Sequence, residues 1–169
     1  MDAIAPDTHA KRKSRWERAE PSPVQITARD LDYLQLLFEN GPTRANLIHA
    51  LVAPDVTQAV TTRRLNRLFR APRPLLERPA QQRESYNANY SFLVYDLGAA
   101  GEQLLAERGC ISEEDRAWRA SLRRSRYLNF WHDVLLGEII GSIRLGVRDN
   151  SALRFIPWRE ILRKAPHAT

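Results

Sequence analysis

The sequence predicts a mostly α-helical fold with one small β-hairpin and a helical extension on its C-terminal side. Three apolar segments with helical spacing lie between residues 27 and 70, and breaks at Gly41-Pro42 and Pro54 separate them. Two aliphatic and aromatic segments with strand character follow, and a long apolar segment begins near residue 127. A chain of 169 residues with 43% hydrophobic residues has enough apolar material for a packed core.

The first helix is expected to begin after Thr27, because threonine caps helices and Asp30 stands three residues later, near the positive helix end. Gly41 permits a left-handed cap and Pro42 cannot continue a helix, so the helix ends there. The expected core stripe of this helix is Leu31, Leu34, Leu37 and Phe38.

Two further helices follow closely. Thr43 is expected to cap a short helix, Arg44–Leu51, and either Asp55 or Thr57 opens a third helix that ends near Arg70. The residues of the third helix that share its apolar side are Thr61, Leu65, Leu68 and Phe69. Three helices with such tight breaks match the core of a helix-turn-helix domain, whose third helix enters the major groove of DNA.

Two strands are expected after the third helix, at Leu75–Arg78 and Tyr90–Leu97. The segment between them, Gln81–Asn87, is polar and offers no core residues, so the two strands are predicted to form a β-hairpin with a polar tip. Such a hairpin is a wing, and residues 25–110 are therefore predicted to form a winged helix-turn-helix domain.

The side of the third helix opposite its apolar stripe carries arginine, asparagine and threonine, which are the residue types that bond base edges and phosphates. A solvated basic face that binds nothing is the alternative. The candidate DNA-binding residues are Thr57, Gln58, Thr62, Arg63, Asn66, Arg67 and Arg70 on this helix, and Arg78, Gln82 and Arg83 on the wing.

Residues 1–24 mix charged and proline residues without an apolar period, which is typical of a segment that stays disordered. Its basic cluster, Lys11, Arg12, Lys13 and Arg15, is expected to lie along the DNA backbone or minor groove. A solvated tail without a role is the alternative.

Composition narrows the class of protein. A net charge of +6 and a pI near 10.0 favour a polyanionic partner. The only cysteine, Cys110, allows neither an intramolecular disulfide nor a cysteine zinc site, and a protein without disulfides favours the cytoplasm. The first twenty residues lack the apolar core of a secretory signal. The apolar stretch 128–147 carries four ionisable residues, so we expect a helix of a soluble protein and no membrane contact.

Three segments, Ile26–Asp30, Arg63–Phe69 and Tyr95–Leu105, resemble winged-helix regulators and, more narrowly, the plasmid replication-relaxation family. In that family a strand ending in Tyr-x-Leu-Thr runs into a helix starting Gly-x-x-Leu-Leu, and a later helix begins with His and Asp, here His132 and Asp133. Two departures are Gly98, where the family has the threonine, and Ala71-Pro72, where it has a turn glycine. The resemblance implies a DNA-binding protein of plasmid replication or transfer.

The C-terminal extension, residues 111–169, is expected to begin with a helix capped by Ser112. Its next helix, Tyr127–Val147, is apolar on more than one face and carries glycines one turn apart, which favours close pairing with a second chain. The candidate dimerisation residues are Phe130, Trp131, Val134, Gly137 and Gly141. The alternative is packing within the chain, against a strand at Leu153–Ile156 and a last helix at Trp158–Lys164.

The function expected from the sequence is sequence-specific binding of double-stranded DNA by a homodimer, as a transcriptional or plasmid replication and transfer regulator. A protein-interaction module that uses a winged helix without DNA is the alternative. Adjacent positions on a helix face about 100° apart, so His132 and Asp133 make a poor catalytic pair, and no catalytic motif is found. We therefore expect no enzyme activity, no metal site and no cofactor.

Overall fold

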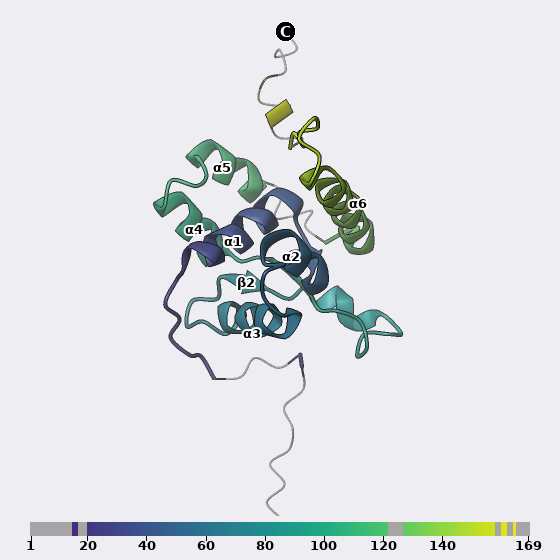
Figure 1. Ribbon diagram of the computed structural model, residues 1–169. Helices are drawn as coiled ribbons and strands as arrows, with labels where there is room; N and C mark the ends of the chain where they lie inside the picture. The colour runs from purple at the N-terminus through teal and green to yellow at the C-terminus, as the bar shows by residue number, and fades with distance from the viewer. Residues whose placement is uncertain (1–14, 17–19, 122–126, 158–159, 162–163, 165–169) are drawn as a thin grey trace, which may run out of the picture.

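The computed structural model describes residues 15–16, 20–121, 127–157, 160–161 and 164, and it confirms a mostly helical fold with a small sheet (Figure 1). Three helices come first, with a two-residue strand between the first two, and a second strand, a 3₁₀ turn and a third strand follow. Three further helices complete the described fold. The elements in chain order are α1 (Ala28–Asn40), β1 (Thr43–Arg44), α2 (Ala45–Val52), α3 (Gln58–Phe69), β2 (Leu76–Glu77), η1 (Ala80–Glu84), β3 (Val94–Leu97), α4 (Ala99–Glu107), α5 (Glu113–Ser121) and α6 (Phe130–Arg148).

The sheet has three antiparallel strands in the order β1-β3-β2, with Thr43 opposite Tyr95 and Leu76 opposite Leu97. Strand β1 was not predicted, because two residues carry no period. The predicted strand at 90–97 begins only at Val94. A three-helix unit with such a sheet is consistent with a winged helix-turn-helix.

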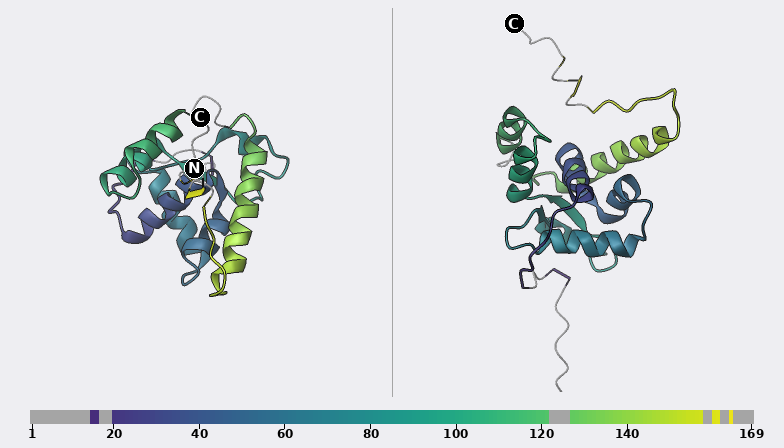
Figure 2. Two further views of the ribbon diagram at one scale, coloured as in Figure 1. Left: turned by 90° about the horizontal axis from the view of Figure 1, so that it is seen from above. Right: turned by 60° about the vertical axis from the view of Figure 1, so that its left-hand side comes forward.

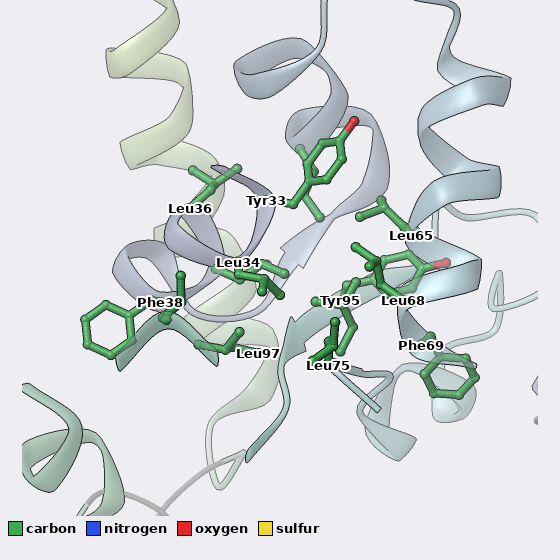
Figure 3. Packing of buried hydrophobic residues seen from close by; sticks show 14 of the residues in the cluster. Tyr33, Leu34, Leu36, Phe38, Leu65, Leu68, Phe69, Leu75, Tyr95 and Leu97 are labelled. Carbon is green, nitrogen blue, oxygen red and sulfur yellow. The ribbon is translucent and has the colours of Figure 1, made fainter. Parts of the chain in front are cut away.

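The hydrophobic core lies where α1, α3 and the sheet meet (Figure 3). Leu34 of α1, Leu65 and Leu68 of α3 and Tyr95 of β3 are fully buried there. The inward sides predicted for α1 and α3 are confirmed, apart from Leu31, which is only partly buried.

The helix starts follow the predicted caps in three of four cases. Thr27 caps α1, and Thr57 occupies the N-cap position of α3 without a side-chain cap hydrogen bond. The Ser112 hydroxyl accepts a 3.1 Å hydrogen bond from the Asp115 amide at the start of α5. The prediction for Thr43 is wrong: Thr43 belongs to β1 and pairs with Tyr95 of β3, and Arg44 occupies the cap position of α2.

Helix α6 packs on its own chain, alongside α2 and β1 and on the side away from α4 (Figure 2). A Cβ atom on Gly137 would lie 3.2 Å from the Pro42 carbonyl oxygen, and one on Gly141 would lie 2.7 Å from Leu47 Cδ2. Phe130 and Val134 are buried against Val94 of β3. The prediction that these four residues of α6 face a second chain is therefore wrong, because they pack against β3, α2 and the turn before β1 of their own chain.

The expected intrachain partners of α6 also need correction. Residues 153–156 form no strand, and the predicted helix 158–164 lies largely outside the described residues. Charged side chains of α6 instead reach β1 and α1: Glu138 pairs with Arg44, and Arg144 Nη1 lies 3.0 Å from Glu39 Oε2. No helix in the described part of the chain is long and apolar enough to cross a membrane.

A second charged network joins α5 to the sheet. Arg119 of α5 donates to Asp96 Oδ1 at 2.7 Å and to Glu102 Oε1 at 2.9 Å, and both carboxylates are buried. The Tyr127 hydroxyl, just before α6, donates to Asp96 Oδ2 at 2.9 Å. The extension is thus built onto the winged-helix unit through β3.

Candidate nucleic-acid interface

The surface of α3 that points away from the core lies at the edge of the molecule (Figure 1). We call Gln58, Thr62, Arg63, Asn66 and Arg67 its outward face. Arg63 and Arg67 are exposed, and neither side chain makes a hydrogen bond or an ion pair with any residue that the structure describes. Thr57 is exposed at the start of the helix and Arg70 is partly buried at its end.

Arg64, the residue after Arg63, points to the other side of α3 and fixes the orientation of α3 on α1. Arg64 Nε donates to Asp30 Oδ1 at 2.7 Å, and Asp30 is fully buried at the first turn of α1. Asp30 also accepts hydrogen bonds from the amide and hydroxyl of Thr27, at 2.7 and 2.8 Å. The Asp30 carboxylate therefore caps α1 and anchors α3 at once.

The protonation of this pair follows from its contacts. Burial acts to raise the pKa of Asp30, but the hydrogen bonds from Arg64 and Thr27 outweigh it and hold the pKa below its usual value. The hydrogen bond to Asp30 likewise raises the pKa of Arg64. Both groups are charged at neutral pH, so the outward face is presented on a helix with a fixed rotation.

An open groove of about 640 Å³ runs beside the outward face of α3. Gln58, Thr62, Arg63 and Asn66 form one wall, and Ser91, Phe92 and Leu93, which precede β3, form the other with Arg15. The structure thus brings five of the predicted DNA-binding residues to one groove.

The wing prediction for Arg78 is wrong. The guanidinium of Arg78 donates to the Tyr95 hydroxyl at 2.7 Å, to Asn66 Oδ1 and to the Arg15 carbonyl oxygen at 2.8 Å, and lies over the Phe69 ring at 4.3 Å. Burial lowers the pKa of Arg78 and raises that of Tyr95. Both terminal nitrogens of Arg78 are engaged by protein acceptors and its Nε is buried, so Arg78 links α3, β3 and the N-terminal segment.

The prediction for Gln82 is wrong for a related reason. Its amide accepts from the Val94 amide at 2.9 Å and donates to the Val94 carbonyl at 2.9 Å. The buried side chain thereby pairs with the backbone of β3 as a neighbouring strand would. The Gln82 side chain therefore shapes the wing and is not exposed for a phosphate contact.

The exposed cation of the wing is Arg83, which donates to the Trp16 carbonyl at 3.3 Å and lies 5.7 Å from the Trp16 ring. Arg15 donates to the carbonyls of Asn89 and Ser91. The N-terminal segment at residues 15–16 therefore rests on the wing. Lys11, Arg12 and Lys13 lie outside the described residues.

Sequence reasoning missed Arg64 and Tyr95 as positioning residues. A signal for Arg64 was present, because it directly precedes the buried Leu65 and so lies at the margin of the core side of α3. The ring and hydroxyl of Tyr95 engage Arg78, seventeen residues away, and nothing local indicates that contact.

The comparisons with known proteins identify a family for most of the chain. No curated protein and no solved structure matches it. The family model described as replication-relaxation matches residues 34–168, from within α1 to beyond α6. The chain belongs to the replication-relaxation family.

Proposed function

We propose that this protein binds double-stranded DNA sequence-specifically and acts in the replication or transfer of a plasmid. The observation that carries the proposal is the outward face of α3, where Arg63 and Arg67 are exposed and unpaired with any described residue. Arginine reads guanine in the major groove by a bidentate contact, and Thr62 is a further base- or phosphate-bonding type. Asn66 lies on the same face, but its Oδ1 already accepts a hydrogen bond from Arg78. Their common helix is the one that enters the groove in helix-turn-helix proteins.

Electrostatics support the same partner. The chain carries a net charge of +6, and Arg15 and Arg63 line one groove while Arg83 lies on the adjoining wing. Exposed cations of this kind neutralise phosphates and release counterions, which gives affinity without reading sequence. Membership of the replication-relaxation family supports plasmid replication or transfer as the process.

Dimerisation remains part of the proposal, on a surface of α6 that keeps Trp131 of the five predicted residues and leaves out the other four. One side of α6 exposes large apolar side chains, each between 42% and 55% exposed. We call this side the outer stripe of α6; it consists of Trp131, Leu135, Ile139 and Ile143. Residues four apart share one helix face, and a two-fold pair of such helices would cover both stripes. The same stripe favours the second candidate function, a protein-interaction module that does not need DNA.

A mobility-shift series with duplex fragments from around the protein's own gene tests the proposal. We expect one fragment to bind at least a thousandfold more tightly than random duplex at matched salt, with log K falling linearly against log salt. Equal binding to every fragment would contradict sequence-specific recognition. If the protein binds no fragment, and sedimentation shows that it associates with itself, the result would favour the protein-interaction module.

A further inference from the structure

The segment between η1 and β3, Ser85–Leu93, presents aromatic rings to solvent on an otherwise polar stretch; we call it the wing loop. The relative exposure is 101% for Tyr86 and 92% for Tyr90. Phe92 is half-exposed and lines the groove beside α3. Tyr86 and Tyr90 bury little of their rings in the fold, so both rings are accessible to a partner.

The wing loop has internal hydrogen bonds that hold its backbone in tight turns. The amide of Ala88 donates to the Ser85 carbonyl, and the amides of Tyr90 and Ser91 both donate to the Asn87 carbonyl, each at 2.9 Å. Arg15 ties the far side of the loop by donating to Asn89 and Ser91. The two tyrosines therefore project from a preorganised turn, which lowers the entropy lost when they bind.

The surroundings of the loop indicate the class of partner. Arg15 and Arg83 flank it, and Glu84 is the only carboxylate between residues 78 and 93. Phe92 joins the loop to the wall of the groove that faces Arg63. An aromatic surface edged by cations and continuous with a basic groove suits nucleic acid, because rings stack on base faces while arginines neutralise phosphates.

We propose that Tyr86 and Tyr90 form a base-stacking site that takes unstacked bases beside the duplex segment contacted by α3. This inference rests on the proposed function, and it adds that the protein prefers DNA whose bases are already opened next to its recognition site. A base in a closed duplex is stacked on both faces, so a ring can reach it only where a step is kinked or melted.

The test compares binding to a closed duplex of the tightest-bound fragment with binding to versions that each carry a short mismatch bubble at a different position. We expect the wild-type protein to bind one bubble duplex about tenfold more tightly than the closed form, in line with the measured strength of base stacking on aromatic rings. The variant Tyr86→Ala/Tyr90→Ala should lose that preference and keep its affinity for the closed duplex. The variant Tyr86→Phe/Tyr90→Phe keeps both rings and should retain it.

Each other outcome overturns the inference in a recognisable way. Equal binding to closed and bubble duplexes by the wild-type protein removes the stacking site and leaves recognition by α3 intact. Loss of the preference in the phenylalanine variant assigns the effect to the hydroxyl groups. A wild-type protein that binds neither DNA form removes both the inference and the proposed function. A change in sedimentation of the alanine variant without a change in DNA preference assigns the loop to protein contacts.

Discussion

Helices α3 and α6 each bury one side in the same chain, but their exposed sides differ in chemistry. The outward face of α3 carries arginine, asparagine and threonine, whereas the outer stripe of α6 carries tryptophan, leucine and isoleucine. The buried sides differ as well: α3 is fixed by leucines and the Arg64 ion pair, and α6 by two glycines that let it approach α2 and β1 closely. A polar exposed side suits a polyanion, and an apolar one suits a second protein surface.

The comparison teaches that a glycine pair or an arginine run does not by itself say which side of a helix meets a partner. Gly137 and Gly141 have the spacing of a helix-pairing motif, but both meet their own chain: Gly141 approaches Leu47 of α2, and Gly137 approaches Pro42 in the turn before β1. Arg63 and Arg64 look alike in sequence, yet one is exposed and the other is bonded to a buried carboxylate. Substitutions on the buried and the exposed side of each helix should therefore have different effects.

The largest effect on stability is expected for Arg64→Ala. Removal of the guanidinium leaves the fully buried Asp30 without its charge partner, which costs about 3 kcal/mol of unfolding free energy, near the low end for such pairs because Arg64 is 22% exposed. The neighbouring Arg63→Ala is the matched control and should change it by less than about 0.5 kcal/mol. Urea unfolding of the two variants measures both changes in unfolding free energy. Similar losses would refute the assignment of Arg64 to the buried side of α3 and of Arg63 to its exposed side.

The variant Gly141→Leu should destabilise the folded chain by about 1–3 kcal/mol, because even its Cβ atom would meet Leu47 Cδ2 at 2.7 Å. The control is Gly146→Leu in the same helix, where a Cβ meets nothing within 4 Å and the better helix former should add stability. Thermal unfolding at one matched protein concentration measures both. A Gly141→Leu variant as stable as the wild type would mean that α6 does not pack on α2 as described.

The Asp30–Arg64 pair gives a pH dependence of known sign. Since the pKa of Asp30 is lowered in the folded chain, its contribution is complete above the unfolded value near 4 and is lost as the pH falls through the folded pKa. The difference in unfolding free energy between the wild type and Asp30→Asn should therefore narrow below about pH 4. A difference that stays constant between pH 7 and pH 2.5 would show that the carboxylate charge is not what stabilises the contact.

The smallest effect on stability is expected on the outer stripe of α6. The variant Ile139→Lys changes a half-exposed side chain, so the unfolding free energy should move by less than about 0.5 kcal/mol. If the stripe joins two copies, sedimentation of this variant at micromolar concentration should show a lower mass than the wild type, because a charge is introduced twice into one apolar contact. A wild-type protein that is already monomeric there would remove the dimer from the proposal.

Local patterns predicted the parts of the fold that depend on neighbours in sequence. The Thr27–Asp30 capping pair, the leucine spacing of α1 and α3 and the Ser112 cap all involve residues within one or two turns of each other. The outward face of α3 follows from the same period. These features needed no knowledge of the tertiary contacts.

The errors concern residues whose partners are distant in sequence. Gln82 pairs with Val94 and Arg78 with Tyr95, so side chains that looked like solvent-facing wing residues are part of the fold. Gly98 is another case: a Cβ there would lie 2.9 Å from the Pro74 carbonyl oxygen, and this close contact explains a glycine where the family pattern has threonine. A single sequence does not contain such contacts in any local form.

The most direct test of the central claim, that the outward face of α3 reads DNA sequence, is specific binding by Arg63→Ala and Arg67→Ala with the fold intact. The account predicts that each variant unfolds at the wild-type urea concentration, loses about 1–3 kcal/mol of specific binding free energy, and discriminates less well at one base pair. Its affinity for random duplex should fall far less. Two variants that both keep wild-type affinity and wild-type discrimination for the specific fragment would contradict the claim.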